Sequence, residues 1–116
     1  MGKDIMRVMN NTKRKKKPKD LYVILHFQHR LASRYNVVLT IKEIKVLSNN
    51  IKKRLILLDY VMKLSWSRIV GTMNIKGKEV IVVYNTKKHL LCTALPAIEL
   101  VNIKKGEYVP RHIIIK

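Results

Sequence analysis

Four short apolar runs, separated by brief turn signals, limit the fold of this chain more than any other feature. They begin at residue 54 and read RLILLDYVM, SWSRIVGTMNI, KEVIVVYN and HLLCTAL, with many β-branched residues. The segments between the later runs, Lys76-Gly77-Lys78 and Asn85-Thr86-Lys87-Lys88, have the composition of hairpin loops. Because connections this short join only antiparallel neighbours, the sequence predicts a meander of three or four strands.

The region before these strands has the spacing of helices. Phe27, Leu31 and Tyr35 recur every four residues and would form one apolar stripe facing a core. Residues 20–26 fit either a strand or the start of this helix. Thr40-x-x-Glu43 is a capping box, which predicts a second helix at about 41–48, ending at the following Asn pair. We therefore expect an α+β fold in which two N-terminal helices cover one face of the sheet.

The length and charge of the chain predict one basic domain preceded by an arm. The 116 residues suffice for a single core, and 25 Lys and Arg against 7 Asp and Glu give a formal net charge of +18. Residues 1–19 form a predicted flexible basic arm, because residues 10–19 are a charge block without apolar periodicity. The predicted domain, residues 20–116, keeps a net charge of +11. Such a charge predicts a polyanionic partner, with RNA as the first candidate and DNA as the second.

The composition argues against several other classes of protein. Cys92 is the single cysteine, which excludes an internal disulfide framework and a cysteine-built zinc site. The histidines and acidic residues are not in metal-ligand spacing, so we expect no metal and no other cofactor. No stretch has the length and hydrophobicity of a signal peptide or a membrane span. We expect a cytoplasmic protein that has no membrane partner.

A second stripe lies beside the apolar one in the segment HFQHRLASRYN, residues 26–36. His26, Arg30 and Arg34 recur there every four residues. Neighbouring arginines disfavour the charged form of a histidine, which leaves more neutral imidazole to act as a base. Metal-independent RNA cleavage needs a base, an acid, and cations or donors that stabilise the phosphorane. This chain can supply all of these groups without a carboxylate.

These features resemble the small toxin-type ribonucleases of the Barnase–EndoU–colicin–RelE superfold. The resemblance covers residues 22–96 and rests on the H-x3-R-x3-R helix, the hairpin RIVGTMNIKGKEVIVVYN, and a final strand similar to T-x-x-P, here Thr93-Ala94-Leu95-Pro96. It implies two helices on a curved antiparallel sheet and RNA cleavage without metal. The sequence lacks the C-terminal Arg/Lys–Tyr ending of the better-known toxins, for which Tyr108, Arg111 and His112 are the candidate replacements.

The resemblance also implies catalytic roles for four residues. His26 would be the acid or the base, Arg30 and Arg34 would bind or polarise the phosphate, and Thr93 would donate a hydrogen bond to it. A hydrolase of this toxin-like kind would also have a neutralising partner, an acidic antitoxin.

Further nucleic-acid contacts are predicted from the strands and from the arm. Strand alternation would place His89, Leu91 and Thr93 on one face, so that His89 shares the site with Thr93. Arg68 and Tyr84 are candidates on neighbouring strands. The predicted contacts from the arm are Lys13, Arg14, Lys15, Lys16 and Lys17.

Each of these residues also has a simpler explanation. His26 could serve only to begin a helix, Arg30 and Arg34 could be a solvated face, and Thr93 is a good strand former. Trp66 is expected in the core, although an exposed tryptophan on a basic sheet would be a stacking platform for a base.

Three functions therefore stay open at this stage. The first is a metal-independent endoribonuclease, or a degenerate relative that only binds RNA. The second is a non-catalytic nucleic-acid-binding protein, ribosome-associated or viral. The third is a small inhibitor that binds an acidic protein partner.

Overall fold

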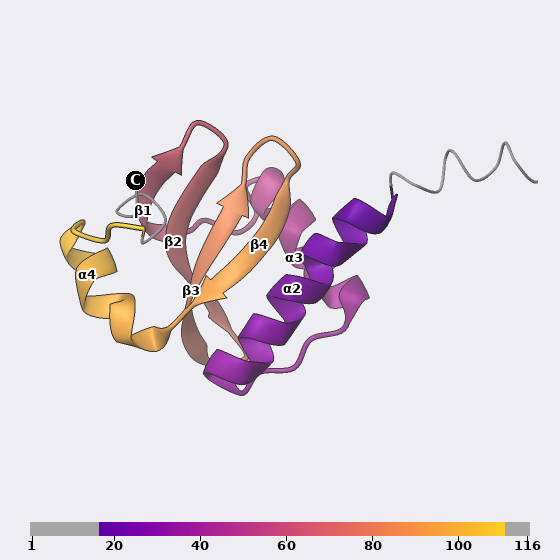
Figure 1. Cartoon of the computed structure of the whole chain (residues 1–116), viewed down its shortest axis with the longest axis horizontal. Coiled ribbons are helices and arrows are strands. Elements are labelled where there is room, and N and C mark those ends of the chain that lie inside the picture. Colours follow the sequence, from indigo (N-terminus) through magenta and orange to yellow (C-terminus); the bar gives the residue numbers. More distant parts are fainter. Residues whose placement is uncertain (1–16, 111–116) are drawn as a thin grey trace, which may run out of the picture.

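The structure, a computed structural model, describes residues 17–110, with side chains from residue 20 onward (Figure 1). Two helices come first, α2 (Lys17–Tyr35) and α3 (Ile41–Lys52). Four strands follow, and then a 3-10 helix and a short α-helix: β1 (Asp59–Ser65), β2 (Arg68–Ile75), β3 (Lys78–Asn85), β4 (Leu90–Leu95), η1 (Ala97–Glu99) and α4 (Leu100–Lys105).

The strands form one antiparallel sheet in the order β1-β2-β3-β4. The turn between β2 and β3 is Lys76-Gly77, and both residues have positive φ, as a two-residue hairpin turn requires. The predicted α+β fold, with two helices on an antiparallel meander, is confirmed.

Helix α2 begins earlier than the sequence predicted. Its first residue is Lys17, so residues 17–19 belong to the helix and not to the arm. Pro18 does not prevent this, because the amide groups of the first helical turn have no intrahelical acceptor and a proline there loses no hydrogen bond. Residues 20–26 are therefore helical, which decides between the two alternatives for them. Residues 1–16 lie outside the described part of the chain, and with them most of the predicted arm.

Helix α3 has the predicted start but a later end. The Glu43 amide donates to Thr40 Oγ1 at 3.1 Å, and the Thr40 amide donates to Glu43 Oε1 at 2.8 Å, which confirms the capping box. The helix continues to Lys52, because one more turn brings the apolar side chain of Ile51 against the core. Arg54, and not the Asn pair, adopts the left-handed conformation after the helix, with φ 63°.

The larger part of the core lies between the two helices and the sheet. Phe27 and Leu31 are fully buried and Tyr35 is 7% exposed, as the apolar stripe predicted. They pack in one cluster with sheet residues such as Val82 and Leu91. The stripe of α2 therefore faces the core, and its adjacent face lies toward the edge of the sheet.

Side chains of the two helices bind backbone groups of the edge strand β4, which runs beside α2 (Figure 1). The Tyr35 hydroxyl donates to the Leu95 carbonyl oxygen at 2.7 Å and accepts from the Ile81 amide at 3.2 Å. The buried Ser48 hydroxyl accepts from the Leu91 amide at 3.0 Å. These bonds hold the edge strand in place and cover polar groups that would otherwise be open to another strand.

The opposite face of the sheet carries a smaller core. Val70, Ile81 and Val83 are buried there against Ile103 of α4, a helix that the sequence analysis did not predict. In Figure 1, α4 lies on the β1 side of the sheet, away from α2. The part of this face that lies nearer β4 borders a cavity.

Candidate functional site

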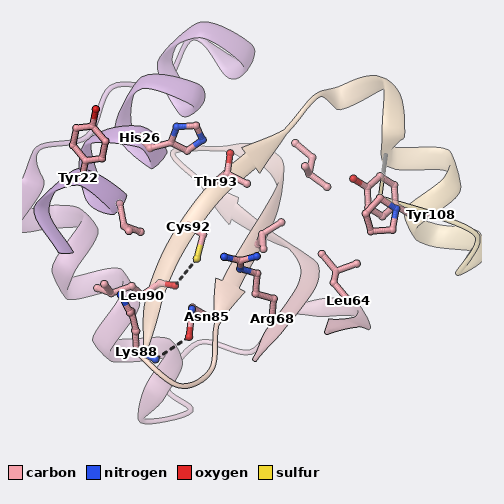
Figure 2. A pocket seen from close by; sticks show the side chains of 14 residues that line it. Tyr22, His26, Leu64, Arg68, Asn85, Lys88, Leu90, Cys92, Thr93 and Tyr108 are labelled. Atoms are coloured by element: carbon pink, nitrogen blue, oxygen red, sulfur yellow. Dashed lines mark hydrogen bonds between the residues drawn. The ribbon is translucent and has the colours of Figure 1, made fainter. Parts of the chain in front are cut away.

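A cavity of about 570 Å³ opens at the edge of the sheet (Figure 2). Its walls come from segments far apart in the sequence: the first half of α2, all four strands, the turn after β3, and the C-terminal segment at Tyr108 and Pro110. His26, Arg68 and Thr93 all line it. Three predicted site residues thus meet in one cavity, although 67 positions separate the first of them from the last.

The polar groups are spread along the length of this cavity. Figure 2 shows His26 and Thr93 at one end, Asn85 and Lys88 at the other, and the Arg68 guanidinium between them. Apolar side chains, including Leu64, Leu90 and Leu95, form much of the remaining wall. Among the described residues, the cavity therefore offers one imidazole, the hydroxyls of Thr93, Tyr22 and Tyr108, and two cations on a mainly apolar surface.

His26 has a chemical environment that favours its neutral form. Partial burial lowers the pKa of the imidazole below its ordinary value of 6.5, and the charges of Arg30, Arg34 and His29 lower this pKa further. The sequence pointed to the arginines as the cause, but desolvation is the largest single contribution. At neutral pH the imidazole is consequently able to accept a proton.

Thr93 reaches the cavity through an irregularity in β4. Val83 is opposite Thr93, while the next residue of β3, Tyr84, is opposite Leu91, so Cys92 is an extra residue on β4. This bulge turns Leu91 toward the helices, where it is fully buried, and leaves both Cys92 and Thr93 on the cavity wall.

The bulge also overturns the predicted grouping of His89, Leu91 and Thr93 on one face. Strict alternation requires a regular strand, and β4 is not regular. His89 precedes the strand, in the turn, with φ 58°, and it borders a different cavity near the end of α3. Tyr84 is buried on the helix side, where its hydroxyl donates to the Ser48 carbonyl oxygen at 3.2 Å. Neither His89 nor Tyr84 lines the cavity that contains His26.

The two arginines of the H-x3-R-x3-R helix do not line the cavity either. Arg34 is turned to the protein itself, since its Nη1 donates to the Ala94 carbonyl oxygen at 2.8 Å. Arg30 is half-buried and acts on His26 through its charge. Arg68 is the arginine that the fold brings into the cavity, in the place that the resemblance implied for Arg30 and Arg34.

The cationic residues predicted in the arm cannot be placed in the same way. Lys13, Arg14, Lys15 and Lys16 lie outside the described residues, as do Arg111 and His112. Lys17 is the first residue of α2, but its side chain is not among those described. Tyr108, the third candidate replacement for the missing toxin ending, does line the cavity.

Several cavity residues were missed by sequence reasoning. Tyr22 is exposed and stands four residues before His26, so the same helical spacing that linked His26 to Arg30 could have indicated it. Lys88 follows the end of β3 and is ion-paired with Asp20 at 3.7 Å across two exposed side chains. No signal in the sequence distinguished Lys88 from the many other lysines.

Cys92 also lines the cavity, but its thiol has low reactivity there. Burial raises the pKa of its thiol, and the nearby Arg68 guanidinium opposes this shift only in part. Its Sγ contacts the Leu90 carbonyl oxygen at 3.7 Å. Because the thiolate is the reactive species, a thiol with a raised pKa is a poor nucleophile.

Trp66 contradicts the expectation that it belongs to the core. It lies in the turn between β1 and β2, and 70% of its surface is exposed. The turn projects beyond the end of the sheet, where no core is available to bury an indole. Lys87 Nζ lies 3.8 Å from the centre of the ring.

Comparison with family models, curated proteins and solved structures gives no match to this chain. In the part of the chain that the structure describes, no helix combines the length and apolar character needed to cross a membrane. The same residues contain no group of three or more His, Cys, Asp or Glu that could hold a metal ion.

Proposed function

We propose that this protein is a metal-independent endoribonuclease and that the cavity lined by His26, Arg68 and Thr93 is its active site. The observation that carries the proposal is the meeting of His26, Thr93 and Arg68 in one cavity from three different elements. The toxin-type resemblance supports the same chemistry for His26 and Thr93. The net charge of +18 supports RNA as the polyanionic substrate.

His26 is the base in this proposal. Its neutral imidazole takes the proton of a ribose 2′-hydroxyl, and the 2′-oxygen then attacks the adjacent phosphorus. The bond from phosphorus to the 5′-oxygen breaks, which leaves a 2′,3′-cyclic phosphate on one product and a 5′-hydroxyl on the other. The lowered pKa of His26 suits this role, since the base must be unprotonated at neutral pH.

Arg68 and Thr93 stabilise the charge that develops on the phosphate. The Arg68 guanidinium can offer two parallel N–H donors to the non-bridging oxygens, and Thr93 offers a hydroxyl donor. The leaving 5′-oxygen takes its proton from water, and the Lys88 ammonium, at the other end of the cavity from His26, is a further cation for the RNA backbone. Its exposed ion pair with Asp20 does not prevent this, because such surface pairs are weak.

In this proposal the protein acts in the cytoplasm and is kept inactive by a protein partner. RNA is available in the cytoplasm, and Cys92 stays reduced there. An enzyme that cleaves RNA without a metal cofactor is active wherever RNA is present, so the proposal includes an acidic antitoxin that covers the basic cavity until it is released.

The test is cleavage of an end-labelled single-stranded RNA pool by the full chain in EDTA, with analysis of the product ends. The proposal expects cleavage that persists in EDTA and leaves 2′,3′-cyclic phosphates. Arg68→Ala, which removes the central cation of the cavity, should lower the rate by about 10²–10³-fold. Tight RNA binding without any cleavage would overturn the enzymatic proposal and favour a protein that acts by occupying RNA.

A further inference from the structure

Trp66 is the only tryptophan of the chain, and it is held in an exposed position at one end of the sheet. Large aromatic side chains are usually buried to a high degree, because burial of their surface stabilises the fold. An indole that is 70% exposed contributes little of that stabilisation. Its position therefore calls for a reason other than packing.

The turn that carries Trp66 is attached to the turn between β3 and β4. The Thr86 amide donates to the Ser67 carbonyl oxygen at 2.8 Å, and Lys87 Nζ lies 3.8 Å from the centre of the Trp66 ring. Both turns lie at the same end of the sheet (Figure 1). These two contacts hold the indole in place before any ligand arrives, which reduces the entropy lost on binding.

This end of the sheet is continuous with the cavity. Arg68 stands two residues after Trp66 and lines the cavity, and Lys88 stands next to Lys87 and lines it too. Trp66 and its ring contact Lys87 are thus each within two positions of a residue that lines the cavity. A nucleic acid that places one phosphate at Arg68 has its neighbouring nucleotides close to the indole.

An exposed aromatic ring beside cations that follow a backbone is the combination with which proteins bind single-stranded nucleic acid. Every unpaired base offers a face on which an indole can stack, whereas the bases of a duplex are stacked on one another. We propose that Trp66 is a base-stacking platform and that the RNA taken by the cavity is single-stranded. This inference rests on the proposed function of the cavity and adds a binding residue and a substrate class to it.

The experiment uses the intrinsic fluorescence of Trp66, which reports on this position alone. The full chain is titrated with a short single-stranded 2′-O-methyl RNA, which cannot be cleaved through its 2′-oxygen. A strand of the same length without bases and a duplex of the same sequence serve as comparisons. Anisotropy of an end-labelled copy measures binding separately from fluorescence. We expect quenching by the single strand only, and weaker binding of both comparison ligands.

Three variants separate stacking from a structural role of the indole. Trp66→Ala should weaken binding of the single strand by roughly 5- to 150-fold. Trp66→Phe, which keeps an aromatic face, should retain most of the affinity. Trp66→Leu, which keeps an apolar side chain without that face, should behave like Trp66→Ala. Circular dichroism of each variant establishes that the fold is kept.

The results distinguish failure of this inference from failure of the proposed function. Tight binding without quenching, together with full affinity in Trp66→Leu, would overturn the stacking role and leave the cavity as a candidate ribonuclease site. Equal quenching by the strand without bases would also overturn it. Absence of binding to any of the three ligands would overturn the proposed function itself.

Discussion

Arg34 donates a hydrogen bond from Nη1 to the carbonyl oxygen of Ala94 at 2.8 Å, across 60 positions of the sequence. The bond joins the last turn of α2 to β4, the strand that carries Thr93. An arginine to which the resemblance gave a phosphate-binding role is therefore a contact between two of the elements that form the cavity. We therefore expect loss of the Arg34 side chain to change the stability of the protein and the position of β4.

Arg34→Ala should lower the free energy of unfolding by about 1–3 kcal/mol, because the Ala94 carbonyl loses a charged donor at a partly buried site. Arg30→Ala is the matched control, since the Arg30 side chain makes no hydrogen bond or ion pair to another described residue. It should change the stability by less than about 0.5 kcal/mol. Urea unfolding of both variants measures the difference, and equal effects would contradict the structural role of Arg34.

Ser48→Ala should destabilise the protein by about 1–3 kcal/mol. The side chain is 1% exposed, and its hydroxyl accepts from the Leu91 amide, which would lose its partner inside the core. Hydrogen exchange of the Leu91 amide should become faster than in the parent protein. Ser33→Ala removes an exposed hydroxyl on α2 and should leave both quantities unchanged. An unaltered exchange rate at Leu91 would show that another group replaces the serine.

Gly71→Ala should destabilise the sheet through a close contact between β1 and β2. An added Cβ would lie 2.9 Å from the Asp59 carbonyl oxygen and 3.0 Å from the Leu58 Cβ, so β1 would have to move. Overpacking of this kind typically costs about 1–3 kcal/mol. A thermal unfolding midpoint equal to that of the parent would show that β1 can shift without loss.

The pKa of His26, followed by NMR, should lie below 6.5. Arg30→Gln should raise this pKa toward its ordinary value without reaching it, because burial, the largest cause of the shift, remains. Between the two values the unfolded chain binds more protons than the folded one. His26 therefore contributes stability that is present above pH 6.5 and is lost as the pH falls through the folded pKa. A pKa above 6.5 would contradict the proposed environment.

Most of the fold could be predicted from the sequence, because the features that determine it involve residues close together in the chain. The capping box at Thr40 and Glu43, the apolar stripe of α2 and the Lys76-Gly77 turn each depend on residues close in sequence. The ends of the helices were harder to predict from the sequence. The end of α3 depends on the burial of Ile51 against distant residues, which a local pattern does not contain.

The candidate site could be predicted only in part from the sequence, because it depends on how residues far apart in the chain come together in the fold. His26 was named from its spacing with the two arginines, Thr93 from the resemblance to toxin-type ribonucleases, and Arg68 from its place on a neighbouring strand. The bulge at Cys92 decided which residues of β4 face the cavity. Strand alternation could not reveal that extra residue. The exposure of Trp66 likewise follows from the position of its turn beyond the sheet, and not from its neighbours in sequence.

The single-turnover rate of RNA cleavage in EDTA, compared between His26→Ala and His29→Ala, tests the central claim most directly. The two histidines lie on the same helix, three residues apart, but only His26 lines the cavity. We predict that His26→Ala lowers the rate by about 10²–10⁴-fold with little change in RNA affinity, and that His29→Ala leaves the rate nearly unchanged. Equal rates in the two variants would contradict the assignment of His26 as the base.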